Sequence, residues 1–394
     1  MTFSVDKSKW PRVKFGDVVE NSNVSSRTPL EDGIERYLGL DHLDSGELGI
    51  RRSGDVSDGV TFTKIVMPGQ TVFGKRRSYQ RKVAYADFMA VCSGDILVFG
   101  PKSNSLLKEY LPFVVASEGF LAKAIATSAG SLSPRTRWSD LAKFEFLLPP
   151  VEIQREIVKL LWSIESHLEI LRSLLGSLGA LESQQLRRMI DMEGDQQALG
   201  ELLVSNIGGI WGANPGEDDV DVPVIRGTDL TLNGDIDFES APIRSMRKID
   251  LSKKRLVEGD IVLEKSGGSP DQPVGKMGYV STIDLDLVAS NFCVVLRPNH
   301  NKVQPYYLFL VLRSLYLNGY LAAFIGKTTN LANLRIPEML KKTVHIPRNE
   351  VQQNEINSYQ EMRNSNKKIL DEIGTTNKLR SIIMNTIFET KVNP

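Results

Sequence analysis

The feature that most constrains this chain of 394 residues is an internal repeat, in which a strand-like end runs through proline into a helix start that contains glutamine. The first copy reads KFEFLLPPVEIQ over residues 143–154, and the second reads KKTVHIPRNEVQ over residues 341–352. Four residues of the first copy return 198 positions later: Lys143, Pro149, Glu152 and Gln154 recur as Lys341, Pro347, Glu350 and Gln352. A repeat at a fixed separation indicates a duplicated structural unit, so we expect two similar domains.

Two shorter sequence matches lie upstream of these helix starts. Gly-Asp-Ile occurs at residues 94–96 and again at 259–261, each time before an apolar run that favours a strand. Val-Ala-Ser occurs at residues 115–117 and again at 288–290. We interpret both pairs as equivalent positions in two copies of one α/β domain.

A heptad pattern of apolar residues follows the first proline entry. The residues alternate steps of four and three over about three heptads, which is typical of a coiled coil: Ile157, Leu161, Ile164, Leu168, Leu171, Leu175 and Leu178. No proline interrupts residues 151–193. We therefore predict one helix of roughly 42 residues, about 60 Å long.

A second long helix is predicted from about Glu350 to Phe388. Its apolar stripe is less regular and consists of Ile356, Tyr359, Met362, Ile369, Ile373, Leu379, Ile383 and Ile387. Two helices that each carry one apolar stripe can bury both stripes by packing together. The alternative is that each helix lies alone on its own domain, but most helices of globular proteins have only three to four turns.

Composition limits the class of protein. A chain of this length holds two or three domains, and no apolar run reaches the ~18 residues that a membrane span requires. The N-terminus lacks the apolar core of a signal peptide, so we expect a cytoplasmic protein.

Cys92 and Cys293 are expected to be buried free thiols, and a disulfide between them is the alternative. The four histidines lack the spacing of a metal site, and residues 305–324 are expected to form a buried helix broken at Asn318-Gly319.

The sequence contains no recognisable motif for methyl transfer, nucleotide hydrolysis or DNA cleavage. It has neither an Asn/Asp-Pro-Pro-Tyr/Phe tetrapeptide nor a glycine-rich cofactor loop. Residues 326–328 resemble the end of a P-loop, but Leu321 stands where that motif needs glycine. Asp260, Glu264 and Lys265 lack the spacing of a metal-dependent nuclease. We therefore predict no catalytic residue, no cofactor and no metal in this chain.

The charge distribution indicates where nucleic acid could bind. The 48 basic and 48 acidic residues cancel, although phosphate contacts usually leave a basic footprint. Positive charge is therefore either local or supplied by partners. The segment 75–82 holds five cations and no acid, and its predicted DNA contacts are Lys75, Arg76, Arg77, Tyr79, Gln80, Arg81 and Lys82. Arginine can neutralise phosphate or read guanine, and glutamine can pair with adenine. The alternative is a solvated basic loop without a partner.

In the second domain the predicted DNA contacts fall in two groups. The first group is Arg244, Arg247 and Lys248. The second is Lys265 and Ser266, where the following glycines allow close approach of the backbone to DNA. An ordinary surface turn is the alternative for both groups. The acidic segment 217–221 is expected to lie away from DNA.

In these features the chain resembles the specificity (S) subunits of type I restriction-modification enzymes. The resemblance rests on the repeated helix entry, the Gly-Asp-Ile strand, and a glycine-containing segment before each entry, at residues 130–138 and 326–334. Residues 73–84 also resemble a segment of some recognition domains in this family. The resemblance covers nearly the whole chain. The second entry departs from the usual double proline, since it reads Pro347-Arg348.

The resemblance implies a fold class and an organisation. The fold class is α/β (α+β) target-recognition domains, duplicated and separated by two long antiparallel coiled-coil helices. The expected boundaries are 1–148 for recognition domain 1, 149–196 for spacer helix 1, 197–346 for recognition domain 2 and 347–394 for spacer helix 2. Each domain is expected to read one half of a split, asymmetric DNA site, while the helices set the spacing between the halves.

The resemblance also implies the partners. These are double-stranded DNA, two modification (methyltransferase) subunits that carry S-adenosylmethionine and methylate adenine, and restriction subunits that use ATP to translocate and cleave DNA. Two other classes of function stay open on the sequence alone. One is a self-contained DNA methyltransferase or nuclease with cryptic motifs. The other is a coiled-coil adaptor that does not bind DNA.

Overall fold

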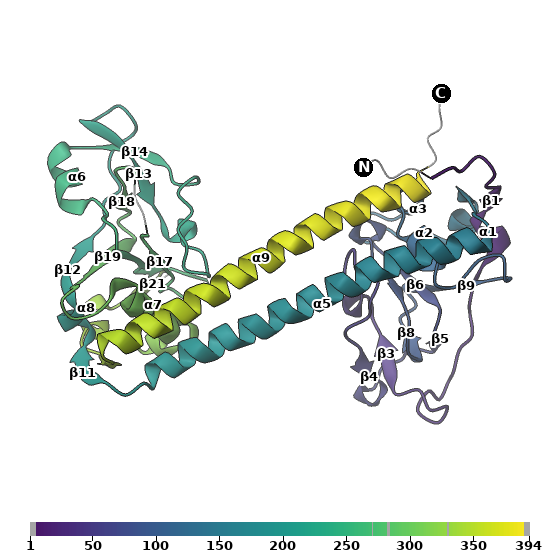
Figure 1. Cartoon of the computed structure of the whole chain (residues 1–394), viewed down its shortest axis with the longest axis horizontal. Helices are drawn as coiled ribbons and strands as arrows, with labels where there is room; N and C mark the ends of the chain where they lie inside the picture. Colours follow the sequence, from purple (N-terminus) through teal and green to yellow (C-terminus); the bar gives the residue numbers. More distant parts are fainter. Residues whose placement is uncertain (1–4, 270, 282–283, 329–330, 390–394) are drawn as a thin grey trace. The chain divides into compact units, whose positions relative to one another are not determined.

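The structure is a computed structural model that describes residues 5–269, 271–281, 284–328 and 331–389. The chain forms two compact units. Unit 1 comprises Met1–Ser173 with Leu370–Pro394, and unit 2 comprises Leu174–Ile369. Two 40-residue helices, α5 (Val151–Ile190) and α9 (Asn349–Phe388), each contribute one half to each unit (Figure 1).

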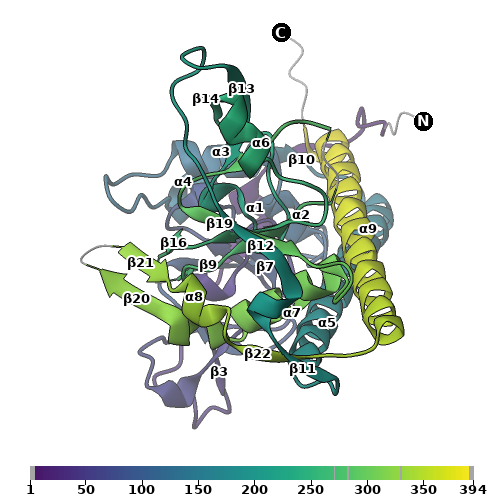
Figure 2. The same ribbon diagram turned by 90° about the vertical axis from the view of Figure 1, so that its left-hand side faces the viewer.

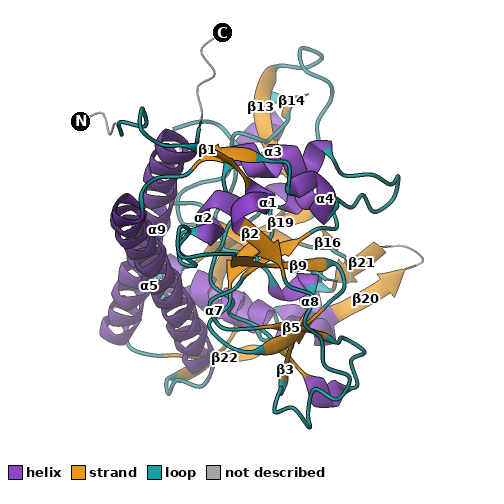
Figure 3. Cartoon of the chain, turned by 90° about the vertical axis from the view of Figure 1, so that its right-hand side faces the viewer, coloured by secondary structure: helices purple, strands orange, loops and turns teal. Residues whose placement is uncertain are grey.

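Unit 1 contains an antiparallel sheet, a mixed sheet and short helices (Figure 3). The antiparallel sheet has the order β2 (Val19–Asn21), β9 (Ile96–Pro101), β6 (Thr71–Gly74), β7 (Val83–Tyr85). The mixed sheet has the order β4 (Gly54–Asp55), β3 (Arg36–Leu38), β8 (Ala90–Cys92), β5 (Lys64–Val66), with β3 and β8 parallel. The remaining elements are β1 (Arg12–Lys14) paired with β10 (Glu145–Leu147), and the helices α1 (Phe15–Val18), α2 (Leu111–Val115), α3 (Glu118–Ala126) and α4 (Trp138–Leu141).

Unit 2 repeats this plan (Figure 2). Its antiparallel sheet has the order β12 (Leu203–Gly208), β19 (Cys293–Pro298), β15 (Ile261–Glu264), β17 (Met277–Tyr279). The other strands are β14 (Ile243–Met246) and β18 (Val288–Ala289) on either side of β13 (Val220–Ile225), β11 (Asp195–Ala198) paired with β22 (Thr343–Ile346), and β16 (Ser266–Gly267) beside the hairpin of β20 (Ile325–Thr328) and β21 (Leu331–Leu334). The helices are α6 (Lys248–Lys254), α7 (Pro305–Leu317) and α8 (Ile336–Met339).

Strand register shows which positions of the two units are equivalent. In unit 1 the β6–β9 ladder pairs Thr71 with Phe99 at one end and Gly74 with Ile96 at the other. In unit 2 the β15–β19 ladder pairs Ile261 with Leu296 and Glu264 with Cys293. The flanking strands match as well, because β7 places Tyr85 opposite Thr71 and β17 places Tyr279 opposite Ile261. The duplicated α/β fold is therefore confirmed at the level of individual residue pairs.

The same register shows that two of the sequence matches were wrong. Gly-Asp-Ile at 94–96 enters β9, whereas Gly-Asp-Ile at 259–261 enters β15, which is the counterpart of β6. Val-Ala-Ser at 288–290 lies at β18, the counterpart of β8, whereas residues 115–117 follow the end of α2. Gly-Asp before a strand is a local turn signal that suits any hairpin, so it marks a turn and not a position in the fold.

The long helices occur where the sequence predicted them and run antiparallel within each unit. In unit 1, His167 Nε2 lies 3.0 Å from Glu372 Oε1, and Arg380 pairs with Glu165. In unit 2, Gln185 Nε2 donates to Glu355 Oε2 over 2.8 Å. The predicted seam is buried at Ile157, Leu161, Ile164, Leu168 and Leu171 but only half-buried at Leu175 and Leu178. No helix of the described residues is long and apolar enough to cross a membrane.

One residue of the predicted α9 stripe is wrong. Leu379 is 50% exposed, and the next residue, Arg380, turns toward the partner helix instead. Because the apolar residues of this stripe are irregularly spaced, the sequence does not define to within one residue which side of the helix is buried. The other stripe residues are buried or half-buried.

The repeated glutamine ties each long helix to its domain. Gln154 is fully buried, and its side chain accepts from the N–H of Leu107 (2.9 Å) and donates to the carbonyls of Ser105 and Pro149 (2.8 Å each). Gln352 accepts from the N–H of Gln304 (2.9 Å) and donates to the carbonyl of Pro347 (2.8 Å). Both glutamines thus satisfy backbone groups of an earlier loop, which precedes α2 in unit 1 and α7 in unit 2, and of the proline before their own helix. The repeated glutamine therefore fixes the start of each long helix to its domain, and we call these hydrogen bonds of Gln154 and Gln352 the clamp.

Two further predictions are confirmed inside the cores. Helix α7 ends at Leu317, Gly319 takes a left-handed φ of 76°, and a short 3-10 helix follows at Tyr320–Phe324. The α7 residues Tyr307 and Phe309 are buried in the core of unit 2. Cys92 and Cys293 are buried free thiols, and burial raises the pKa of each to about 11.

Candidate nucleic-acid interface

Three loops meet at one edge of the antiparallel sheet in each unit. In unit 1, Lys75 follows β6; its N–H donates to the carbonyl of Asp95 (2.9 Å), and its carbonyl accepts from the N–H of Thr136 (3.0 Å). In unit 2, Lys265 follows β15 and makes the same two contacts, with Phe292 (2.9 Å) and Leu334 (2.8 Å). We call these loops the loop edge of each unit: residues 75–82, 93–95 and 129–136 in unit 1, and residues 265–269, 290–292, 325–328 and 331–334 in unit 2.

Side chains in the loop edge of unit 1 form a charged cluster around Asp95. Arg135 Nε donates to Asp95 Oδ1 over 2.7 Å, and Arg76 Nη1 lies 3.6 Å from Asp95 Oδ2. Arg76 also donates to Ser133 Oγ over 2.9 Å. The hydrogen bond from Arg135 holds the pKa of the Asp95 carboxyl below its usual value, so the carboxylate stays ionised. Asp95 thus fixes two arginines on the loop edge.

Arg77 and Tyr79 are the exposed residues of the predicted basic segment that have no side-chain partner among the described residues. Both are exposed, and within the described residues the Arg77 guanidinium and the Tyr79 hydroxyl have no hydrogen-bond or ionic partner. Arg77 has a φ of 52°, in the left-handed region that residues with a Cβ rarely occupy. Its N–H donates to the carbonyl of Pro134 over 2.7 Å, which holds the turn in place. Unusual backbone of this kind concentrates at functional sites.

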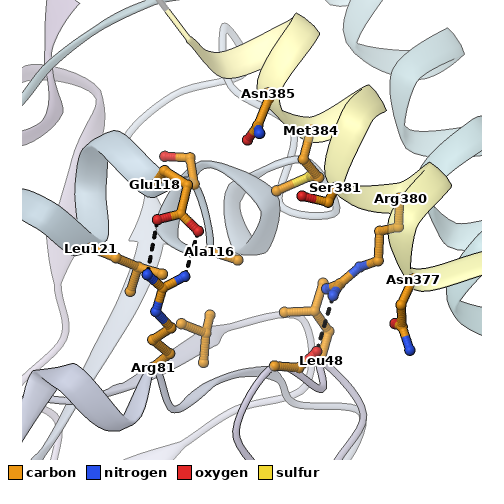
Figure 4. Close-up of a pocket in the computed structure, with 13 residues that line it drawn as sticks. Leu48, Arg81, Ala116, Glu118, Leu121, Asn377, Arg380, Ser381, Met384 and Asn385 are labelled. Carbon is orange, nitrogen blue, oxygen red and sulfur yellow. Dashed lines mark hydrogen bonds and ion pairs between the residues drawn. The ribbon is translucent and has the colours of Figure 1, made fainter. Parts of the chain in front are cut away.

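The other residues of this segment contact their own unit. Arg81 forms a two-pronged pair with Glu118, and both line a cavity of about 130 Å³ beside α9 (Figure 4). On the α9 side of this cavity, Arg380 donates to the carbonyl of Gly46 over 3.0 Å. Lys82 Nζ donates to the carbonyl of Leu40, and Gln80 is half-buried. The structure thus gives Arg81 and Lys82 intramolecular partners, and DNA contact by these residues stays a prediction.

The loop edge of unit 2 is rich in glycine and carries fewer charges than that of unit 1, since its ionisable residues are Lys265 and Lys327. Ser266 Oγ donates to Asn333 Oδ1 over 2.6 Å, within the pairing of β16 and β21. Gly267 and Gly268 follow with φ values of 133° and 78°, which favour glycine. Phe292 takes the position that Asp95 occupies in unit 1 and is 48% exposed. Of the predicted contacts, Lys265 and Ser266 therefore lie on the loop edge.

The other predicted group of unit 2, which is Arg244, Arg247 and Lys248, lies beside the acidic segment 217–221 that was expected to lie away from DNA. Arg247 pairs with Asp250 (2.6 Å), and the Lys248 N–H donates to Asp219 Oδ2 (3.0 Å). Arg244 stacks over the ring of Trp211, with 5.0 Å from its Cζ to the ring centroid. The pairing of β13 with β14 brings these two segments together. DNA binding by Arg247 and Lys248 and avoidance of DNA by residues 217–221 are therefore competing predictions for one surface.

A family model for the type I restriction modification DNA specificity domain matches the chain twice, over residues 7–178 and 198–374. The two matches cover most of the chain, one on each α/β domain. The chain belongs to this specificity-domain family.

One curated relative of this specificity-domain protein is named as the MjaX type I restriction enzyme specificity subunit of Methanocaldococcus jannaschii. The two sequences are 23% identical over 146 residues, which is 37% of this chain and 34% of the relative. The matched part thus spans about a third of the relative's length.

Two solved structures share the fold. The S subunit of a type I restriction-modification system from M. genitalium has a TM-score of 0.60 at 12% identity and covers 100% of both chains. A chain from work on complex assembly and conformational transition of the type I R-M system has a TM-score of 0.58 at 17% identity, over 96% of this chain and 97% of that one. At such low identity the likeness concerns the fold alone.

Sequence reasoning missed several residues of the two specificity-domain loop edges. Asp95 and Arg135 lie 40 positions apart, and only the fold brings them together. Phe292 was assigned to a strand-like run and not to a binding surface, although an aromatic residue in a polar turn such as Ser290-Asn291-Phe292 is a usable signal of an exposed ring. Trp211, which lies outside the loop edge, was not singled out. Glu264 was considered only as a nuclease ligand, and the described residues contain no cluster of metal-binding side chains.

Proposed function

We propose that this chain is the non-catalytic subunit that reads DNA sequence for a type I restriction-modification complex. Each unit reads one half of a split DNA site through its loop edge. The observation that carries this proposal is the double family match, with one copy on each α/β domain and an equivalent loop edge in each. The different side chains of the two loop edges support an asymmetric site, because the arginine-rich edge of unit 1 and the glycine-rich edge of unit 2 present different donors and acceptors.

Helices α5 and α9 act as the spacer in this proposal. Both helices contribute to both units, so a change in their length changes the separation of the two readers. DNA half-sites that face the same side of the duplex are about 34 Å apart per helical turn. The number of base pairs between the half-sites therefore follows from the helices.

The chemistry belongs to partner subunits. We infer two modification subunits, which bind S-adenosylmethionine and methylate adenine, and restriction subunits, which use ATP. The net charge of zero supports this division, because a reader without an excess of positive charge relies on partners to hold the phosphate backbone. Arg77 and Tyr79 in unit 1, and Lys265 and Ser266 in unit 2, are the proposed DNA contacts.

The test is a methylation map of a random DNA library treated with this chain and its modification subunit together. The expected result is methylation at one split sequence, with none when either protein acts alone. Insertion of one turn, about four residues, into both helices near Gly176 and Gly374 is expected to change the spacer and preserve both half-sites. Methyl transfer by the isolated chain would identify a self-contained methyltransferase. Absence of salt-sensitive DNA binding in the complex would identify an adaptor.

A further inference from the structure

The two units fill one equivalent position in opposite ways. Gly74 and Glu264 are equivalent by strand register. Leu40 and Gly227 are equivalent because each is the second residue of the same type of turn. In unit 1 the His42 N–H donates to the carbonyl of Gly39, and in unit 2 the Asp229 N–H donates to the carbonyl of Arg226. In unit 1, a Cβ on Gly74 would lie 2.9 Å from the Leu40 side chain. In unit 2, a Cβ on Gly227 would lie 2.5 Å from Glu264 Oε1.

This exchange shows that the fold does not need a carboxylate here. Leucine over glycine fills the space in unit 1, and glutamate over glycine fills it in unit 2. An apolar filler is the cheaper solution, because a buried carboxylate loses its hydration. Packing alone therefore does not explain why residue 264 is a glutamate.

Glu264 is buried without full compensation. Its exposed fraction is 6%, and within the described residues Oε2 has no hydrogen-bond partner. Burial raises the pKa of this carboxyl, and the Lys276 charge and nearby backbone N–H groups oppose that shift only in part. An unpaired buried acceptor of this kind suits a ligand that brings an N–H donor.

Glu264 lines a cavity of about 490 Å³ that lies within unit 2, next to the loop edge. A volume of this size is ordinary for a small-molecule site. Trp211 and Phe292 also line the cavity and are 37% and 48% exposed. The Arg244 guanidinium holds the Trp211 ring from one side, so the ring is in place before any ligand arrives. Thr228 and Asn291 add polar groups to the wall.

We propose that this cavity, the Glu264 pocket, holds one unstacked base of the second half-site that bears an exocyclic amino group. Glu264 accepts a hydrogen bond from the amino group, and Trp211 and Phe292 contact the faces of the ring. The base must leave the stack, because a base edge inside a duplex does not reach the carboxylate of Glu264, a residue that is only 6% exposed. Adenine, cytosine and guanine carry the required amino group, and thymine does not. This inference rests on the proposed function and names the chemistry read by unit 2.

The test uses the complex of the full chain with its modification subunit on a library of randomised sites. Glu264→Gln removes the charge and keeps the shape. The paired change Gly227→Leu with Glu264→Gly copies the packing of unit 1 and closes the pocket. Glu258→Gln, the same substitution at an exposed residue that does not line the cavity, is the matched control. Both pocket variants are expected to relax one position of the second half-site by about tenfold and to leave the first half-site unchanged.

A second measurement reports the base directly. With 2-aminopurine at that position of the DNA, the wild-type complex is expected to give a rise in fluorescence that the paired variant lacks. An unchanged base preference in both pocket variants, or no fluorescence change with the wild type, overturns the Glu264 pocket and leaves the proposed function standing. Competition by free adenosine or cytidine that Glu264→Gln abolishes also overturns it in favour of a free ligand. If the wild-type complex selects no split sequence, the proposed function itself has failed. Glu264→Gln keeps the test decisive if the paired variant does not fold.

Discussion

The two α/β domains share their backbone pattern and differ at the edge where their loops meet. In unit 1, Asp95 holds Arg76 and Arg135, and the edge is charged. In unit 2, the same position is Phe292, and the neighbouring loop is Ser266 followed by two glycines. The hydrogen bonds that build the edge are the same in both, since Lys75 and Lys265 make matching backbone contacts. Main-chain hydrogen bonds therefore fix the backbone of the loop edge in both units. The side chains on that edge can differ without changing the backbone.

The largest expected effect concerns a feature that the two units share. Gln154→Ala removes a buried side chain that bonds three backbone groups, and we expect a loss of about 3 kcal/mol in the stability of unit 1. Gln352→Ala removes two such bonds, so we expect about 2 kcal/mol in unit 2. Urea unfolding measures both values. Equal effects, or effects within error of an exposed control such as Gln353→Ala, would contradict the clamp.

The next effect concerns DNA. Arg77→Ala in the assembled complex is expected to weaken DNA binding about tenfold. It is also expected to reduce the slope of log K against log salt concentration by about one, because one fewer counterion is released. The reason is that Arg77 is exposed and unpaired among the described residues. Arg247→Ala is the matched change in unit 2 and is expected to have little effect, because Arg247 already pairs with Asp250 beside Asp219. Binding titrations at several salt concentrations decide this, and a larger effect from Arg247→Ala would reverse the assignment.

A smaller effect concerns the charged cluster. Asp95→Asn is expected to lower the stability of unit 1 by about 1 kcal/mol at pH 7, since the pair is partly exposed. The hydrogen bond from Arg135 lowers the pKa of Asp95 below 3.8, so its contribution is present above that pH and is lost as the pH falls through the lowered value. Thermal unfolding from pH 7 to pH 2 is therefore expected to show wild type and variant converging in acid. A difference that persists at pH 2 would show that the carboxylate charge is not the cause.

The last effect is of similar size and has the opposite sign. Burial raises the pKa of Glu264 above 4.5, so the stability of unit 2 falls as the pH rises from 4.5 through the raised value, and the full loss is present above it. Glu264→Gln is therefore expected to stabilise unit 2 by about 1 kcal/mol at pH 8 and to have no such benefit at pH 4. Parallel unfolding curves at the two pH values measure this. Destabilisation at pH 8 would mean that Glu264 is a structural residue, in line with the filling role of Leu40 in unit 1.

The sequence was sufficient for features that depend on local pattern. The heptads after Pro150 predicted α5, and the Asn318-Gly319 break predicted the end of α7, because helix period and turn chemistry are properties of neighbouring residues. The repeated Pro-to-Gln entry predicted the duplication, since Gln154 and Gln352 perform one structural task. The domain boundaries drawn from the sequence remain a prediction.

Features that depend on pairing between distant segments could not be predicted. The equivalence of Gly74 with Glu264 follows from strand register, and the two residues have no sequence similarity. The short Gly-Asp-Ile match led to the wrong register for the same reason, because a turn signal carries no information about its partner strand. Likewise, the proximity of residues 217–219 to Arg247 is a consequence of the β13–β14 pairing.

The division of the long helices between the units has a consequence for the order of biosynthesis. Unit 2 is one continuous segment, whereas the core of unit 1 includes Ile383, Met384 and Ile387. On the ribosome, the first recognition domain to be translated therefore waits for the last helical turns of α9 before its apolar core can close. The second domain, translated later, can fold first. A ribosome that stalls near residue 370 would release a chain with a folded unit 2 and an open unit 1, exposed to proteases and chaperones, so that the proposed two-site reading of DNA requires the last turns of α9.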